Sequence, residues 1–275
     1  MRASDTLAPD TLGPTLCIGE ILVEIVAETV GTGFTEVQRF SGPYPSGAPA
    51  IFIDQCGRIG GSAAIIGAVG NDDFGRVNLD RLRRDGIDVS AVAVDPDLPT
   101  GSAFVRYRPD GRRDFVFNLA HSAAARISRS PAVDAVLARA GHLHVMGTAL
   151  AMAGVWPLID GSIDAIKTRG GTVSFDPNLR KELLADPQML PRIQRVLAAA
   201  DLLLPSEAEV ELVGMPAAAE IVIKHGANGA TAHLEGSRTS APAFRVEEID
   251  PTGAGDCFGG AYVACRRLGM GVERA

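Results

Sequence analysis

The sequence predicts an α/β protein in which a mainly parallel central sheet lies between two layers of helices, with a small second β-sheet as a lid. Three observations support this three-layer α/β/α sandwich. Apolar runs of strand length alternate with segments of helical spacing along most of the 275 residues. The strand-like runs are apolar nearly throughout, as in parallel strands buried on both faces. Two turn-rich or period-two segments, at about 26–46 and 99–120, interrupt the alternation.

The first part of the chain contains two strand–helix pairs. Residues 15–26 form one near-continuous apolar run that predicts the first strand, and residues 48–60 have helical spacing that stops at a glycine. Residues 62–70 predict the next strand. Residues 72–86 predict an amphipathic helix, because two aspartates open it, arginines lie near its end and a glycine closes it.

The later part of the chain repeats this alternation. Strands are expected at 142–147, 172–178, 201–206 and 220–226, and helices at 155–170, 191–200 and 207–214. Such repetition is typical of βαβ units whose parallel strands share one sheet. We therefore expect one domain over 15–275, preceded by a short disordered lead at 1–14.

A hairpin breaks the alternation at residues 102–118. Two period-two strands flank the turn sequence Pro109-Asp110-Gly111. Arg106 and Arg108 share one face of the first strand, and Tyr107 lies on the other. Together with the β-like segment at about 26–46, this hairpin could form a small sheet beside the carboxyl edge of the main sheet, where it would cover a substrate.

Composition and charge exclude several classes of function. A net charge of -7 argues against a nucleic-acid surface, and no apolar run reaches the length of a membrane span. The N-terminus lacks the apolar core of a secretory signal, so we expect a cytoplasmic protein. No C-x-x-C pair occurs, and we interpret the cysteines as reduced core thiols: Cys17, Cys56, Cys257 and Cys265. His142 and His144 have no partner at metal-binding spacing, which favours structural roles.

The stretch "DPTGAGDCFGG" at 250–260 indicates an anion site. Gly253 and Gly255 allow a close approach of the backbone, and a helix that begins near Ala254 would direct its free N–H groups at an anion. The stretch contains neither a Walker loop nor a G-x-G-x-x-G fingerprint. The missing fingerprint argues against a dinucleotide-dependent oxidoreductase.

This stretch closely resembles the second signature of the ribokinase-like (PfkB) carbohydrate kinases, D-T-x-G-A-G-D-x-F, and the resemblance extends from about Cys17 to Leu268. It implies that Gly253, Ala254 and Gly255 form an anion hole for the transferred phosphate. Asp256 would be the general base that takes the proton of the attacking hydroxyl. Asp250 and Thr252 would shape the loop and approach the nucleotide.

The family's first signature is matched less completely, around residues 46–75. Ser46 replaces its first glycine, and Ile51 replaces an asparagine that commonly holds the sugar in relatives. The positions that fit its layout are Gly47, Gly60, Gly67, Gly70, Asp73, Phe74 and Gly75. An isoleucine cannot bond to a hydroxyl, so the sugar contacts must be rearranged. The motifs around Ile51 and Asp54 do not decide which sugar is bound.

Three further segments resemble the family. In "FDPNLRKELL", Asp176, Asn178 and Arg180 would face the sugar and the phosphates. In "LLPSEAEVELVG", Glu209 would order Mg²⁺ and phosphate through water, with Ser206 where asparagine is usual. "KHGANGA" resembles K-x-G-x-x-G beside the nucleotide. The candidate substrate-binding residues are Glu24, Gly47, Ala48, Asp54, Tyr107, Arg108, Asn178 and Arg180, and the candidate nucleotide-binding residues are Ser206, Lys224, Gly226, Gly229, Asp250 and Thr252.

Two carboxylates within the first predicted strand are candidates for binding sugar hydroxyls. Glu20 and Glu24 are flanked by apolar residues. A carboxylate in such surroundings costs several kcal/mol unless it is partnered or faces a cleft. At least one of the two should therefore face the site, and Glu24 is favoured.

The resemblance implies an ATP-dependent sugar kinase that uses Mg²⁺, with K⁺ near the anion-hole loop as a further candidate. The fructokinase, 2-keto-3-deoxygluconate kinase and tagatose kinase branch is most similar, which favours a primary hydroxyl of a ketohexose of the tagatose or fructose type. A 2-keto-3-deoxy sugar acid is second, because Arg106 and Arg108 could grip a carboxylate. A nucleoside is third, and a non-catalytic sugar- or nucleotide-binding relative is the remaining alternative.

The expected partners are a small-molecule sugar and ATP, without nucleic acid or membrane. A homodimer through the lid sheet is an open prediction. The chain ends soon after Asp256, whereas relatives usually continue through a helix that helps wall the adenine pocket. The nucleotide site is therefore expected to be open unless further segments belong to the protein.

Overall fold

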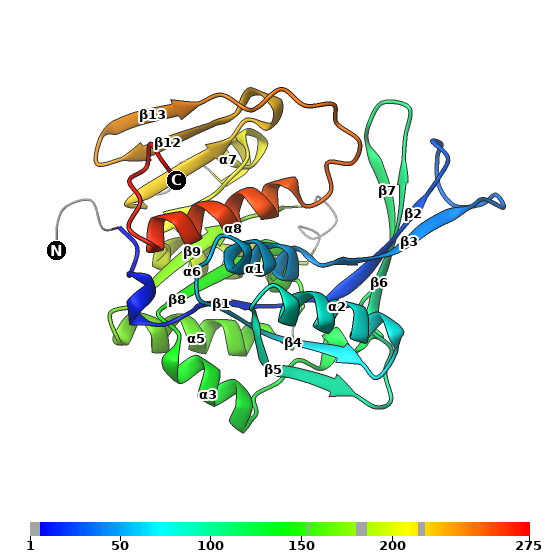
Figure 1. The fold of residues 1–275 in the computed structure, drawn as a ribbon, viewed down its shortest axis with the longest axis horizontal. Helices are drawn as coiled ribbons and strands as arrows, with labels where there is room; N and C mark the ends of the chain where they lie inside the picture. The colour runs from blue at the N-terminus through cyan, green and yellow to red at the C-terminus, as the bar shows by residue number, and fades with distance from the viewer. Residues whose placement is uncertain (1–5, 153, 180–185, 214–217) are drawn as a thin grey trace.

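A nine-stranded sheet forms the centre of the molecule. The computed structural model describes residues 6–152, 154–179, 186–213 and 218–275 (Figure 1). The strand order is β13-β12-β11-β10-β9-β8-β1-β4-β5. The pairs from β11 to β5 are parallel, and β12 and β13 add an antiparallel hairpin at one edge. The strands are β1 (Thr15–Ile18), β4 (Ala63–Gly70), β5 (Asp88–Asp95), β8 (His142–Met146), β9 (Thr172–Asp176), β10 (Leu202–Leu203), β11 (Glu220–Lys224), β12 (Ala230–Leu234) and β13 (Ser237–Ala241).

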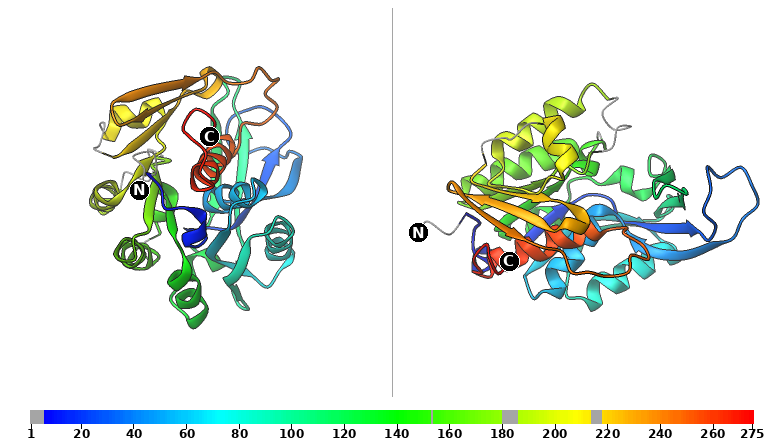
Figure 2. Two further views of the ribbon diagram at one scale, coloured as in Figure 1. Left: turned by 60° about the vertical axis from the view of Figure 1, so that its left-hand side comes forward. Right: turned by 90° about the horizontal axis from the view of Figure 1, so that it is seen from above.

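Helices cover both faces of this sheet, as Figure 2 shows. One face carries α1 (Ala48–Arg58), α2 (Asp73–Arg84) and α8 (Ala254–Arg267), and the other carries α3 (Pro131–Arg139), α5 (Trp156–Thr168) and α6 (Met189–Ala199). Each face has its own apolar cluster, which includes Phe52 and Val263 on the first and Ile163 and Val196 on the second. The short helices α4 (Gly147–Leu150) and α7 (Glu207–Val213) follow β8 and β10. The predicted fold class is confirmed.

The second sheet has four strands and projects to one side of the central sheet (Figure 1). Its order is β3-β2-β6-β7, with β2 (Leu22–Ala27), β3 (Phe40–Ser46), β6 (Gly101–Tyr107) and β7 (Arg113–Asn118). Strands β6 and β7 form the hairpin expected from the turn sequence at 109–111. The predicted small sheet is therefore present, although residues 28–39 contribute no strand to it.

The prediction of a single strand at 15–26 is wrong. The run divides into β1 in the central sheet and β2 in the second sheet. Both strands are largely buried, so the apolar run continues across the break and hides it. At the break, a Cβ on Gly19 would lie 2.5 Å from Pro49 Cγ, which shows how closely the chain passes α1 there.

Residues 6–14 also differ from the expected disordered lead. Leu7 and Ala8 are buried, and residues 10–12 form a turn of 3₁₀-helix. The nearly inaccessible Arg267 of α8 donates to the carbonyl oxygens of Ala8 (2.9 Å) and Gly13 (2.6 Å) and to Thr15 Oγ1 (2.7 Å). Because burial disfavours its charge, the pKa of Arg267 falls to about 10. The buried guanidinium of Arg267 needs hydrogen-bond acceptors, and by bonding to the backbone of residues 8–13 it fixes the conformation of this segment.

The cysteines and the two strand histidines have the structural character expected of them. Cys17 and Cys56 are buried, Cys257 and Cys265 are half-buried, and all four are free thiols. His142 and His144 are buried in β8, and Ser174 Oγ lies 2.7 Å from His142 Nε2 and 2.8 Å from His144 Nδ1. Within the described ranges, no helix is both long and apolar enough to cross a bilayer.

Candidate active site

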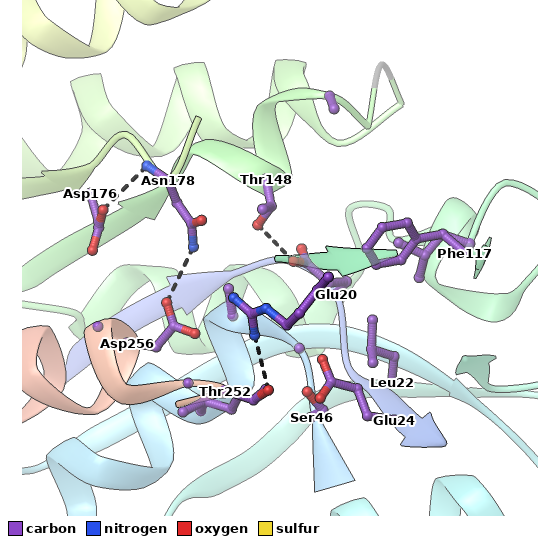
Figure 3. Close-up of a pocket in the computed structure, with 18 of the residues that line it drawn as sticks. Glu20, Leu22, Glu24, Ser46, Phe117, Thr148, Asp176, Asn178, Thr252 and Asp256 are labelled. Carbon is purple, nitrogen blue, oxygen red and sulfur yellow. Dashed lines mark hydrogen bonds between the residues drawn. The ribbon is translucent and has the colours of Figure 1, made fainter. Parts of the chain in front are cut away.

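A cavity of about 680 Å³ opens between the carboxyl edge of the central sheet and the second sheet (Figure 3). It lies where the strand order reverses at β1, between β8 and β4, which is the position where open α/β sheets bind ligands. The sequence-predicted residues that line it are Glu24, Gly47, Ala48, Asp176, Asn178, Ser206, Glu209, Lys224, Gly226, Thr252, Gly253, Gly255 and Asp256. Residues from distant parts of the sequence therefore meet here.

The N-terminus of α8 forms one wall of the cavity. Gly253 precedes the helix with φ 75°, a left-handed conformation that favours glycine. A Cβ on Gly253 would lie 3.0 Å from Ile51 Cδ1, so the position is crowded as well. Ala254 begins the helix, and Asp256 lies in its first turn. The free N–H groups and the positive end of the helix dipole are thus beside the cavity, where they favour an anion.

Asp256 belongs to a chain of polar side chains along the sheet edge (Figure 3). Asn178 Nδ2 donates to Asp256 Oδ1 (3.2 Å), and Asn178 N donates to Asp176 Oδ1 (3.2 Å). Lys224 Nζ makes an ion pair with Asp176 Oδ2. Burial raises the pKa of Asp176, and the Lys224 ammonium offsets part of this effect. This chain holds the carboxylate of Asp256 and the ammonium of Lys224 in one site.

Glu209 ties together the loops that leave β9 and β10. Its Oε1 accepts from Leu179 N (2.6 Å), and its Oε2 accepts from Ser206 N (2.7 Å) and Ser206 Oγ (2.8 Å). Among the described residues, no group of three His, Cys, Asp or Glu side chains is placed to hold a metal ion. Three donors already satisfy the glutamate, which fits contact with a metal through water rather than direct ligation.

Glu20 and Glu24 both line the cavity (Figure 3). Glu20 lies at the break between β1 and β2, and its Oε1 accepts from Thr148 Oγ1 of α4 (2.6 Å). Glu24 lies in β2, on the second sheet. Sequence reasoning favoured Glu24, and the structure brings Glu20 to the same cavity from a different side.

The second sheet reaches the anion-hole loop through two side chains. Tyr107 Oη donates to Asp250 Oδ1, and Arg113 Nη1 donates to Thr252 Oγ1 (3.0 Å). Although burial opposes it, the hydrogen bonds from Tyr107 and Thr252 lower the pKa of Asp250. Arg113 lines the cavity and was not predicted from the sequence. The period-two alternation of β7 indicates that Arg113 and the residues next to it point to opposite faces of the sheet. It does not indicate which face packs against the anion-hole loop.

Comparison with known proteins agrees with this geometry. Residues 15–275 match the pfkB family of carbohydrate kinases. The chain belongs to the PfkB family. It is 30% identical over 260 residues to Fructokinase-1 of Oryza sativa subsp. japonica, a match that covers 89% of this chain and 80% of that protein. The carbohydrate kinase predicted from the sequence is thus confirmed.

Solved structures of PfkB kinases are similar over nearly the whole chain. The apo form of the E. coli protein "putative Ribokinase II" is 42% identical, with a TM-score of 0.89 over 95% of this chain and 88% of that chain. Its complex with ATP and Mg²⁺ gives a TM-score of 0.87 at 40% identity, with the same coverage. A fructokinase double mutant from Vibrio cholerae O395, bound to fructose, ADP and potassium ion, is 26% identical with a TM-score of 0.76, covering 94% of this chain and 85% of that chain.

Several predicted site residues do not line the cavity of this PfkB kinase. The buried Asp54 lies one turn beyond Ile51 on α1 and accepts from Arg81 Nη2 of α2 (2.7 Å). Arg108 makes an ion pair with Asp114 within the second sheet. A Cβ on Gly229 would lie 2.0 Å from Ala241 O, so that glycine serves the close approach of the chain after β13. Arg180 lies outside the described residues.

The other wall of the cavity is apolar, and sequence reasoning missed most of it. Leu22, Phe117, Leu119 and Met152 line this wall, together with several alanines. They come from β2, β7, the segment after β7 and the segment after α4. None of these residues carries a chemical signature, so only their placement in the fold identifies them.

Proposed function

We propose that this PfkB kinase transfers the γ-phosphate of ATP to a primary hydroxyl of a ketohexose of the fructose or tagatose type. One observation carries the proposal: the Asp256 carboxylate lies in the first turn of α8, beside the N–H groups after Gly253, in a cavity that Glu20 and Glu24 also line. Base, anion site and acids suited to hydroxyl groups therefore meet in one space. The fructokinase relatives support the choice of sugar.

The proposed mechanism assigns each group one task. Asp256 accepts the proton of the attacking hydroxyl, a role worth on the order of 10²–10⁴-fold. The sugar oxygen then bonds to the γ-phosphorus, and ADP leaves with the electron pair of the broken P–O bond. The N–H groups of Gly253 and Gly255 stabilise negative charge that develops on the phosphoryl oxygens, whereas Ala254 N donates to Pro251 O (3.1 Å). Glu20 and Glu24 bind other sugar hydroxyls and orient the acceptor.

ATP enters beside Lys224, Gly226 and the loop at 250–252. A Cβ on Gly255 would lie 3.6 Å from Lys224 Nζ, so the ammonium sits over the anion-hole loop. Mg²⁺, when bound with ATP, offsets phosphate charge, with Glu209 contacting it through water. K⁺ near this loop remains a prediction, as do a cytoplasmic location and a homodimer through the second sheet, where Phe40, Tyr44 and Val116 are exposed.

A coupled ADP-release assay with Mg-ATP and a panel of acceptors tests the proposal. We expect kcat/KM to be highest for fructose or tagatose. A maximum for 2-keto-3-deoxygluconate or for a nucleoside would replace the proposed substrate and keep the reaction. No ADP release with any acceptor, despite measurable ATP binding, would favour a non-catalytic binding protein. Product analysis by ³¹P NMR would show whether the phosphate is on a primary carbon.

A further inference from the structure

Arg113 is the arginine of the second sheet that reaches the cavity. It begins β7, lines the cavity, and donates from Nη1 to Thr252 Oγ1 in the anion-hole loop (3.0 Å). Its guanidinium carbon also lies 5.4 Å from the centre of the Phe115 ring, whose face can support a cation. The side chain is half-buried. Its contacts with Thr252 and with the Phe115 ring position the guanidinium.

Two other arginines of the same sheet are used differently. The buried Arg106 donates to the carbonyl oxygens of Thr29 (3.2 Å) and Gly33 (2.9 Å), which fixes the loop between β2 and β3. Arg108 is paired with Asp114. Neither lines the cavity, so they maintain the shape of the sheet, and the sugar-acid role considered for them from the sequence has no support in their positions.

The charges around the cavity leave Arg113 available for an anion. Five carboxylates line the described part of the cavity: Glu20, Glu24, Asp176, Glu209 and Asp256. Among the described residues, the cations that line it are Lys224 and Arg113. Lys224 is already paired with Asp176, whereas Arg113 donates to the neutral hydroxyl of Thr252. Nearby Asp250 is engaged by Tyr107 and by Thr252 N. A polyphosphate entering the described part of this acidic cavity would therefore meet the Arg113 guanidinium, which makes no direct ion pair with a described carboxylate, although its charge acts on nearby Asp250.

We propose that Arg113 is a catalytic residue that contacts the phosphoryl group during transfer from ATP to the acceptor. This inference rests on the proposed kinase function and adds a residue to it. As Asp256 takes the hydroxyl proton and the P–O bond to ADP breaks, the guanidinium, held beside Thr252 next to the α8 N-terminus, donates hydrogen bonds to the equatorial oxygens. The second sheet thus supplies positive charge to the reaction as well as a cover for the substrate.

Turnover of matched arginine variants tests this role. With Mg-ATP and the best ketohexose, Arg113→Ala is expected to lower kcat by about 10²-fold or more, in the range found for arginines and oxyanion donors at such positions. KM for the sugar should change less than about fivefold. Added guanidinium ion should restore part of the turnover. The control Arg112→Ala, whose arginine pairs with Asp110 at the exposed turn, should retain wild-type turnover.

A binding measurement separates this role from others. In the presence of the sugar, Arg113→Ala should weaken a non-hydrolysable Mg-ATP analogue at least tenfold more than Mg-ADP, because only the former has a γ-phosphate. Equal weakening of both nucleotides, or a loss of turnover matched by Thr252→Val and not restored by guanidinium, would overturn the proposal in favour of loop positioning. A large rise in the sugar KM with kcat retained would overturn it in favour of acceptor binding. The binding ratio remains measurable even if the wild-type protein phosphorylates no ketohexose, so the two proposals fail separately.

Discussion

The carboxyl edge of the central sheet and the second sheet face the same cavity but hold their charged side chains differently. At the edge, Asp256, Asn178, Asp176 and Lys224 bond to one another inside the site. In and beside the second sheet, Arg106 bonds to the loop between β2 and β3, and Arg108 pairs with Asp114 of β7, both outside the cavity. The edge is therefore a preorganised reaction centre, whereas most charges of the second sheet maintain its shape. Substitutions at the edge should affect chemistry and stability, whereas in the second sheet only Arg113, which reaches the cavity, should affect turnover strongly.

The largest expected effect is at Asp256. Replacement by Asn keeps the size of the side chain and removes the proton acceptor, so kcat should fall by about 10²–10⁴-fold. Affinity for ATP should change little, because the N–H groups of α8 remain. Steady-state kinetics and thermal unfolding measure both effects, with exposed Asp80→Asn as the control. Full turnover by the Asp256→Asn variant would refute the role of this carboxylate.

The second prediction concerns the ion pair between Lys224 and Asp176. Lys224→Met leaves a buried carboxylate without its cation, which should lower the free energy of unfolding by about 3 kcal/mol near neutral pH. The exposed pair of Lys167 and Asp201 provides the control, and Lys167→Met should cost less than about 1 kcal/mol. Urea unfolding monitored by circular dichroism gives both values.

The pH dependence of this loss has a defined sign. Burial already raises the folded-state pKa of Asp176 above its unfolded value of about 3.9, and losing Lys224 would raise it further. Between the unfolded and folded pKa values the folded state binds more protons, so stability falls as pH rises through that window. The loss caused by Lys224→Met should be small below about pH 4 and grow to its full value above the folded pKa. A loss that is equal at all pH values would show that packing, not charge, is responsible.

The two regions also differ in how far the sequence predicts them. The edge is encoded by local motifs: Gly253 to Asp256 open a helix, Asn178 follows β9 and Lys224 ends β11, so their spacing alone places them at the carboxyl ends of parallel strands. The faces of β6 and β7 depend on which side of the sheet packs against the anion-hole loop. Strand alternation cannot supply that information, which is why Arg108 was expected in the site and Arg113 was not.

Long-range packing explains the remaining differences in the fold. The break at Gly19 between β1 and β2 is invisible in the apolar pattern because both strands are buried in different sheets. The order of residues 6–14 depends on Arg267, more than 250 positions away in the chain. The hairpin of β12 and β13 contains many small and polar residues at an edge of the sheet, and therefore has little hydrophobic signal.

A smaller effect is expected at Tyr107, which joins the two regions. Tyr107→Phe removes the hydrogen bond to Asp250 and keeps the aromatic ring. A hydrogen bond to a charged group contributes about 1.5–3 kcal/mol, so KM for the sugar should rise by about ten- to hundredfold while kcat stays within about threefold. The control Tyr44→Phe lies on β3, where its side chain is half exposed. A fall in kcat larger than the rise in KM would show that Tyr107 takes part in the chemical step.

The smallest effect is expected at Arg108, although the sequence placed it in the substrate site. Its guanidinium donates to Asp114 Oδ1 from both Nε (2.9 Å) and Nη2, and the pair is half-buried outside the cavity. Hydrogen bonds from Arg108 and Gly33 N lower the pKa of Asp114, so the carboxylate keeps a donor when the arginine is removed. Arg108→Ala should therefore leave kcat and the sugar KM within about twofold of wild type. Since Arg113→Ala in the same hairpin is expected to lose about 10²-fold in kcat, parallel kinetics of the two variants test the distinction directly. If Arg108→Ala were as impaired as Arg113→Ala, turnover would depend on the structure of the whole hairpin and not on the Arg113 guanidinium alone.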